Sequence, residues 1–266
     1  MDYQLRKNVL FQNLNYFASN KDYLKQQADN NLNRKKTMCT PAEIYVLQGD
    51  WGDVLLKLSF KYGSEFVVLN MANTYVPGGG YLQGCPAQEE NMFRRSDCHF
   101  NIINDPNVSW DDTNNHYIYN KKYQDLINAK NGLVYLDNKN PRILFADNET
   151  NKYKILPNDK IIPFYEMRSA AIDCSQQPFD IKEMEKRIVA QFNTAKKVGL
   201  EYLLLGAFGC GAFQCPPKIV AEIYKKTIKT FINDFSVIAF AIYYPGYGPT
   251  DNYDIFKSII ESESKF

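Results

Sequence analysis

Two neighbouring carboxylates, Glu89 and Glu90, follow three consecutive glycines, Gly78-Gly79-Gly80, after a short spacer. Consecutive glycines let the backbone approach a ligand closely and present N–H groups in conformations that other residues resist. Such a turn suits an anion, above all a pyrophosphate. Two acids would repel a phosphate, so they favour contact with another part of the same ligand, such as ribose hydroxyls and a glycosidic oxygen. For the glycines alone, a flexible turn before a helix with an acidic first turn is the simpler interpretation.

A second glycine-rich loop lies between a predicted strand and a predicted helix, and it reads Gly206-Ala207-Phe208-Gly209-Cys210-Gly211-Ala212-Phe213. The turn from a strand into a helix is an ordinary place for a phosphate-binding loop. No Gly-Lys-Ser/Thr follows, so this is not a Walker loop. Gln214 stands where the dinucleotide fingerprint requires its third glycine. The loop by itself therefore gives only a weak indication of a phosphate-bearing ligand.

Cysteine and histidine chemistry is not indicated. The cysteines include no C-x-x-C pair, so a structural zinc site is not expected. With two histidines in the chain and no G-x-S-x-G motif, a serine or cysteine hydrolase is disfavoured. We expect Cys210 to be a small, buried neighbour of a phosphate rather than a nucleophile. The sequence thus predicts neither a metal nor a cofactor.

The spacing of apolar residues predicts the elements that position these loops. Residues 5–30 have the spacing of a helix, and a basic, Asn-rich connector then leads to Thr40-Pro41. Strands are predicted at 44–47 and 66–69, and helices at 54–60 and from about Gln88. The C-terminal third reads as a helix from Ile181 to Gly199, a strand at 202–205, a helix opened by Pro216-Pro217, and a strand at 237–242. Such units imply parallel strands with right-handed crossovers, whose following loops gather at one edge of the sheet.

Composition and charge limit the classes of protein to which the chain can belong. The chain has 266 residues, of which 45% are hydrophobic and 23% charged, so wholesale disorder is excluded. A net charge of +1 provides no basic field for nonspecific binding of nucleic acid. No stretch reaches the ~18 apolar residues of a membrane span, and the N-terminus lacks the apolar core of a secretory signal. We expect a soluble, monomeric, intracellular protein of the cytoplasm. An effector exported by an unconventional route is the alternative.

Taken together, the two loops resemble a known family. Gly78-Gly79-Gly80, a seven-residue spacer and Gln88-Glu89-Glu90 match the GGG…QEE signature of poly(ADP-ribose) glycohydrolases. Asn70-Met71-Ala72-Asn73 before this signature and Arg94-Arg95-Ser96 after it resemble the microbial-type branch of that macrodomain family. The segment 203–222 is similar to the family's second diphosphate loop. Arg94 and Arg95 themselves are expected to make structural ion pairs.

Other segments of the chain resemble the family, and some differ from it. Gly49-Asp50 is similar to the macrodomain position where an aspartate meets the adenine amino group. Ala170-Ala171-Ile172 resembles the end of a strand that normally continues with a proline. Segment 100–130 matches nothing in the family, and Tyr243-Tyr244-Pro245 stands where a small or acidic residue is more usual. These departures concern the acceptor, the group attached beyond the distal ribose.

The resemblance implies a macrodomain-like three-layer α/β/α sandwich with a mixed, largely parallel sheet. Residues 1–266 would form one catalytic domain, with 1–40 as an N-terminal helical extension packed on it. The implied partner is ADP-ribose, free or attached to a protein or polymer. The residues expected to bind ADP-ribose are Asp50, Asn73, Gly78, Gly79, Gly80, Gln88, Gly209, Cys210, Gly211, Ala212 and Phe213.

The resemblance also implies an activity and residue roles. The enzyme would hydrolyse the C1″ glycosidic bond of ADP-ribose attached to protein side chains or present in poly(ADP-ribose). Glu90 would be the general acid, Glu89 and Asn73 would hold ribose hydroxyls, and Phe213 would pack beside the distal ribose. The altered segment 100–130 favours a specialised acceptor such as an arginine side chain. Two alternatives stay open: a reader that binds ADP-ribose without cleaving it, and a hydrolase of free nucleotide-derived metabolites.

Overall fold

The computed structural model describes residues 1–32, 40–244, 246 and 250–262. Most of the predicted Asn-rich connector, at 33–39, and Pro245 lie outside the described residues. Within these ranges the central sheet has seven strands. Its order is β1 (Glu43–Gln48), β9 (Val237–Ile242), β8 (Tyr202–Leu205), β2 (Val67–Met71), β7 (Ile162–Ser169) and β5 (Tyr135–Leu136), with β6 (Arg142–Leu144) also paired to β7.

The strand directions confirm the predicted mixed, largely parallel sheet. β1, β9, β8, β2 and β7 pair in parallel, whereas β5 and β6 run antiparallel to β7. β8 is buried along its whole length and β2 along all but its last residue. This burial explains their continuous apolar runs, because a parallel sheet is covered by helices on both faces.

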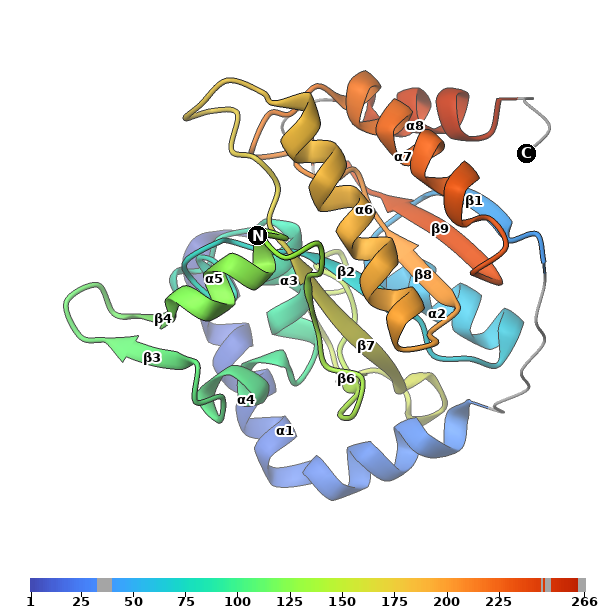
Figure 1. Cartoon of the computed structure of the whole chain (residues 1–266). Helices are drawn as coiled ribbons and strands as arrows, with labels where there is room; N and C mark the ends of the chain where they lie inside the picture. The colour runs from blue at the N-terminus through green and yellow to red at the C-terminus, as the bar shows by residue number, and fades with distance from the viewer. Residues whose placement is uncertain (33–39, 245, 247–249, 263–266) are drawn as a thin grey trace.

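Helices cover the two faces of the sheet and confirm the predicted three-layer sandwich (Figure 1). One face carries α6 (Ile181–Lys197), α7 (Pro217–Phe231) and α8 (Asn252–Ile260), whose apolar side chains share a core with β8 and β9. The other face carries α1 (Tyr3–Asn31), α2 (Trp51–Tyr62), α3 (Gln88–Arg95) and α4 (Cys98–Ile103). None of the described helices is both long and apolar enough to cross a lipid bilayer.

Helix α1 begins at a side-chain cap and is kinked within its length. The Asp2 carboxylate accepts the backbone N–H of Leu5 at 2.8 Å, as an N-cap does. Asn20 has non-helical backbone angles, which mark the kink. On the inner side, the buried Asn13 amide donates to the Arg94 carbonyl at 2.9 Å. Helix α1 therefore buttresses α3, the helix that carries Glu89 and Glu90.

The region between β2 and β7 also contains several short elements. It includes η1 (Tyr81–Gln83), α5 (Lys121–Ile127), η2 (Asn158–Lys160) and a hairpin of β3 (Val108–Asp111) and β4 (His116–Tyr119). The hairpin extends away from the central sheet in Figure 1. Trp110 on β3 is 44% exposed and packs edge-on against Tyr117.

Candidate active site

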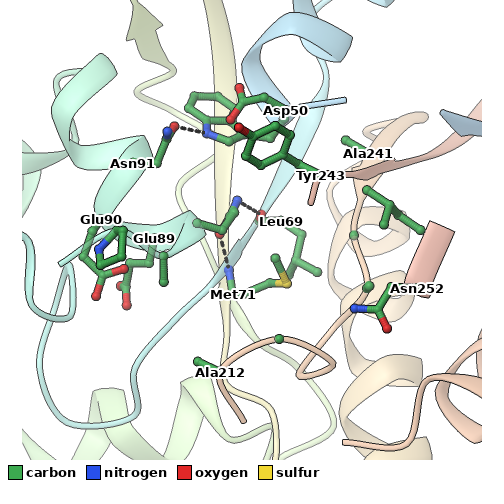
Figure 2. Close-up of a pocket in the computed structure, with 18 of the residues that line it drawn as sticks. Asp50, Leu69, Met71, Glu89, Glu90, Asn91, Ala212, Ala241, Tyr243 and Asn252 are labelled. Atoms are coloured by element: carbon green, nitrogen blue, oxygen red, sulfur yellow. Dashed lines mark hydrogen bonds between the residues drawn. The ribbon is translucent and has the colours of Figure 1, made fainter. Parts of the chain in front are cut away.

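A cavity of about 1190 Å³ opens where the parallel strands end. Its wall includes the last residues of three strands, Met71 of β2, Leu205 of β8 and Ile242 of β9. Both predicted glycine loops reach it, so the rule that loops after parallel strands gather at one sheet edge holds here. All the predicted catalytic and ligand-binding residues line this cavity except Gly78 and Cys210. In Figure 2, Glu89 and Glu90 lie together on one wall of the cavity, and Asp50 lies near Tyr243 in another part of it. Ala212 lies apart from both pairs.

The Glu89 carboxylate is fixed by two backbone amides. Its Oε2 accepts the N–H of Asn73 at 2.7 Å and its Oε1 accepts the N–H of Gly78 at 2.9 Å. Glu89 is 4% exposed, yet it lies on the cavity wall. A carboxylate oxygen has a second lone pair, so each oxygen keeps an acceptor site for a ligand hydroxyl. Asn73 is fixed in turn, because its Oδ1 accepts the N–H groups of Tyr75 and Val76 at 2.9 and 3.0 Å.

The Glu90 carboxylate is held by the third glycine of the loop. Its Oε1 accepts the N–H of Gly80 at 2.9 Å. Gly79 has a φ of +55°, and a Cβ there would overlap Glu90 Oε1 and lie 3.2 Å from Glu89 Oε2. Only glycine fits at this point, because it tolerates a positive φ and leaves room for both carboxylates.

The first glycine loop therefore binds anions that belong to the protein itself. The N–H groups of Gly78 and Gly80 serve Glu89 and Glu90, and that of Gly79 donates to the Val76 carbonyl at 2.9 Å. The anion-binding geometry expected of three glycines is present, and its acceptors here are the two glutamates. Contact of this loop with a diphosphate stays a prediction.

Burial raises the pKa of both glutamates. The pKa of Glu89 lies well above its usual range because of burial and the neighbouring Glu90 charge, against the pull of the Asn73 and Gly78 N–H groups. Burial also raises the pKa of Glu90, which the Gly80 N–H and the Arg94 guanidinium lower in part. A carboxyl group that retains its proton above the ordinary range is suited to general acid catalysis.

Gln88 ties the start of α3 to the edge of the sheet. Its Oε1 accepts the N–H of Met71 at 3.0 Å, and its Nε2 donates to the Leu69 carbonyl at 2.9 Å. Both contacts appear as dashed lines in Figure 2. The glutamine thereby continues the hydrogen bonding of β2 and fixes where the next two residues begin. Its predicted contact with the ligand stays untested, and its amide already serves the scaffold.

Arg94 supports Glu90 through a relay of hydrogen bonds. Its Nη2 donates to the Cys85 carbonyl at 2.6 Å, and the Cys85 N–H donates to the Gly80 carbonyl at 3.1 Å. The Gly80 N–H then donates to Glu90. Arg94 is fully buried, and within the described ranges its Nε and Nη1 have no hydrogen-bond partner and no acid lies at ion-pair distance. The expected ion pair of Arg94 is therefore not found there.

Arg95 makes the structural ion pair that the sequence predicts. The fully buried guanidinium contacts the Asp50 carboxylate and lies 3.4 Å from Asp53, and its centre stacks 5.1 Å from the Trp51 ring. Asp50 also caps α2 by accepting the N–H of Gly52 at 2.9 Å. The residue predicted to meet an adenine amino group is thus already oriented by two partners.

The second glycine loop offers backbone donors to the cavity. The N–H groups of Gly209, Gly211, Ala212 and Phe213 have no acceptor among the described residues, and all four residues line the cavity. Amides without a protein acceptor, in residues that line a concave site, suit the oxygens of a diphosphate. This arrangement supports the predicted role of the 209–213 loop.

Cys210 differs from its neighbours in that loop. Its N–H donates to the Ala207 carbonyl at 3.0 Å, its thiol is fully buried, and burial raises the pKa of that thiol. The Cys210 side chain therefore packs beneath the loop, and its thiol is unreactive. No group of three or more His, Cys, Asp or Glu side chains suitable for a metal occurs in the part of the chain that the structure describes.

Three side chains on the cavity wall were given no site role from the sequence, although Tyr243 was named as a departure from the family pattern. Tyr243, just after β9, is 54% exposed and lies near Asp50 in Figure 2. Trp51 donates from its indole N–H to Asn91 Oδ1 at 2.9 Å, and both residues line the same region. The sheet-edge rule could have marked Tyr243 because it follows a parallel strand. Nothing local distinguishes Asn91 from the many other asparagines of the chain.

Comparison with known proteins agrees with this geometry. Residues 2–136 match the family model of the microbial-type PARG (poly(ADP-ribose) glycohydrolase), catalytic domain. Among solved structures, the chain is similar to poly(ADP-ribose) glycohydrolase from Thermomonospora curvata, with 18% identity over 94% of this chain and 97% of that chain and a TM-score of 0.71. A second structure of that enzyme, bound to the inhibitor ADP-HPD, gives a TM-score of 0.69 at 18% identity and the same coverage.

A relative from another bacterium gives the same result. The Deinococcus radiodurans enzyme in complex with ADP-ribose is 19% identical over 92% of both chains, with a TM-score of 0.61. At this level of identity, the structural likeness establishes the fold alone. No curated protein sequence matches the chain.

Proposed function

This chain belongs to the microbial-type poly(ADP-ribose) glycohydrolase catalytic-domain family, and on that premise we propose that Glu90 is the residue with which it cleaves a glycosidic bond. The protein is an ADP-ribosyl glycohydrolase rather than a reader of ADP-ribose. Its substrate would be ADP-ribose linked through C1″ to a further unit of poly(ADP-ribose) or to a protein side chain.

The observation that carries this proposal is the position of the Glu90 carboxyl. It is buried, its pKa is raised by that burial, and it is held by a glycine N–H on the wall of a cavity. A binding module needs the backbone donors of the 209–213 loop but has no use for a proton donor in the same cavity. A residue that releases a proton to a leaving oxygen or nitrogen needs this combination of burial and access.

The arrangement of the two glutamates favours one acid and a bound water. Both carboxylates approach Gly79, so they lie on the same side of the cavity. Glycosidases that use two carboxylates place them on opposite sides of the sugar. In the proposed reaction, Glu90 protonates the leaving atom as an oxocarbenium-like ribose develops, and Glu89 with Asn73 holds the ribose hydroxyls. Water then attacks C1″, and the Glu90 carboxylate takes up its proton.

The substrate is tested by measuring release of free ADP-ribose from four matched substrates. These are poly(ADP-ribose) and proteins carrying single ADP-ribose groups on arginine, serine or glutamate. We expect release from at least one, and the same assay with Glu90→Gln should show its loss. A folded protein that releases ADP-ribose from none of the four, at enzyme concentrations equal to substrate, would contradict the proposal.

A further inference from the structure

Two thiols from distant parts of the chain meet at the end of the second glycine loop, where Cys215 also lines the cavity. Cys174, which follows β7, and Cys215, at the end of the loop, have their Sγ atoms 3.3 Å apart. Cys174 is half-buried, whereas Cys215 is 2% exposed. Both thiols also approach the Ile172 carbonyl, at 3.8 and 3.1 Å. Neither cysteine has a part in the proposed hydrolysis.

Backbone contacts connect this thiol pair to the residues that face the ligand. The Cys174 N–H donates to the Phe213 carbonyl at 2.9 Å, and the Cys215 N–H donates to the Gly209 carbonyl at 3.0 Å. A Cβ at Gly209 would lie 2.7 Å from both Cys215 Sγ and Ala171 Cβ, so Cys215 is tightly packed against Gly209. A shift of either cysteine's backbone would therefore be transmitted to Phe213 or Gly209.

We propose that Cys174 and Cys215 form a reversible dithiol–disulfide pair whose oxidation weakens ligand binding by the 209–213 loop. A disulfide requires about 2.05 Å between the sulfur atoms, against 3.3 Å in this structure. Closing the bond must shift at least one of the two cysteines, each of which is hydrogen-bonded to a residue of the loop. The predicted loss of ligand affinity rests on the proposed function, whereas formation of the disulfide does not.

The proposed oxidant is a low-molecular-weight disulfide such as oxidised glutathione. The more accessible Cys174 attacks as thiolate, the glutathione disulfide breaks, and one glutathione leaves and takes up the proton. Cys215 then gives up its proton, attacks Cys174 Sγ and expels the second glutathione. The protein loses two protons and two electrons, and the oxidant becomes two glutathione thiols. Cys174 makes the first attack because Cys215 is buried, which raises the pKa of its thiol.

The disulfide is tested on the full chain in glutathione buffers of graded ratio. Free thiols are then alkylated and the peptides are mapped by mass spectrometry. We expect a peptide pair linked through Cys174 and Cys215 that a reducing agent reverses. Cys215→Ser should leave a stable glutathione adduct on Cys174, whereas Cys174→Ser should leave Cys215 unmodified. A folded protein that shows no such linked pair at any ratio overturns the proposal.

Cys210→Ala is the matched control for the disulfide. This thiol is also buried in the loop, but its Sγ donates to the Phe208 carbonyl at 3.5 Å and has no sulfur partner at bonding distance in the described ranges. Its replacement should leave the linked pair unchanged. If the linked pair disappears in this variant, the assignment to Cys174 and Cys215 is wrong.

The coupling is tested by calorimetric titration of the reduced and oxidised protein with ADP-ribose. We expect oxidation to weaken affinity by about fivefold or more, a typical coupling between two sites. Linkage is reciprocal, so saturating ADP-ribose should shift the glutathione ratio for half-oxidation by the same factor. Equal affinities in the two forms refute the coupling. A protein that forms the disulfide but binds no ADP-ribose in either form refutes both the coupling and the proposed function, and leaves the dithiol pair standing.

Discussion

Glu90 carries the proton in the proposed reaction, so Glu90→Gln isolates its chemical contribution. Glutamine keeps the size of the side chain, and its amide oxygen can still accept the Gly80 N–H. It has no acidic proton, so turnover should fall by ~10²–10⁴-fold, the usual contribution of general acid catalysis. ADP-ribose affinity, measured by calorimetry, should change little. Turnover within threefold of the wild type would remove Glu90 from the catalytic role.

Glu89→Gln should behave differently because both Glu89 oxygens accept backbone hydrogen bonds. The amide NH₂ would face the N–H of either Asn73 or Gly78, two donors against each other, so one loop must move. We expect weaker ADP-ribose binding as well as slower turnover, the pattern of a residue that holds substrate before and during the reaction. Steady-state kinetics and calorimetry on both variants separate the two roles. Unchanged affinity in Glu89→Gln would contradict the assignment.

The raised pKa of Glu90 fixes the sign of the pH dependence. Burial raises this pKa above the usual value of 4.5, and only the protonated form can donate. kcat/KM should therefore fall as the pH rises through the raised pKa, while at lower pH the acid is fully protonated. The decline should vanish in Glu90→Gln, because that side chain does not titrate. A rate profile that rises with pH over the range where the wild type should decline would indicate a base rather than an acid.

At the scale of elements, the glycine loop and the start of α3 form one unit. Gly79→Ala places a Cβ against Glu90 Oε1 at a φ of +55°, so the glutamate must leave its position. We expect turnover to fall by ~10²-fold or more, as when a general acid is misplaced. The sequence alone predicted that this glycine lets the backbone approach a pyrophosphate. The structure gives displacement of Glu90 as the reason.

Gly132→Ala is the control for this loop variant. Gly132 has a similar positive φ of +72°, but a Cβ there would meet no atom within 4 Å. Both variants should lose about 1–2 kcal/mol of stability to the left-handed backbone, measured by thermal unfolding, and Gly79→Ala should lose more because it also displaces Glu90. Only Gly79→Ala should lose activity. Equal losses of activity in the two variants would show that backbone strain, and not the position of Glu90, is responsible.

The elements themselves were largely predictable from hydrophobic spacing, and the reasons are visible in the structure. The apolar runs at 66–69 and 202–205 mark β2, which begins at Val67, and β8, because both faces of the sheet are covered. Asp180 caps α6 by accepting the N–H groups of Lys182 and Glu183. The acceptors of loop N–H groups could not be predicted. Whether Gly78 and Gly80 bind a diphosphate or a glutamate depends on how α3 packs, which is a tertiary property.

At the scale of the whole molecule, the site exists only because distant segments converge. Asp50, Glu90, Ala212 and Tyr243 follow or face different strand ends and come together at one edge of the sheet. The motif residues were recognisable because their spacing is local. Tyr243 and the Cys174–Cys215 pair were not assigned, because only the strand order brings them to this region.

The convergence predicts that a ligand in this cavity stabilises the whole fold. The cavity wall is built from residues between Met1 and Asn252, so global unfolding must destroy the site and release the ligand. At ADP-ribose concentrations about 100-fold above Kd, mass action contributes about 2.7 kcal/mol. For a chain of this size each kcal/mol raises Tm by about 2–4 °C, so the expected increase is about 5–10 °C.

Thermal unfolding followed by circular dichroism measures this shift, and ribose 5-phosphate is the control ligand. It carries a sugar and a phosphate but cannot span from the Asp50 region to the Glu90 wall, so at the same concentration it should raise Tm much less. Tm should also increase with the logarithm of ADP-ribose concentration once the site is saturated. An unchanged Tm at millimolar ADP-ribose, with no heat of binding in calorimetry, would show that the cavity does not bind ADP-ribose. Equal shifts with both ligands would mean that binding does not need the two ends of the cavity together.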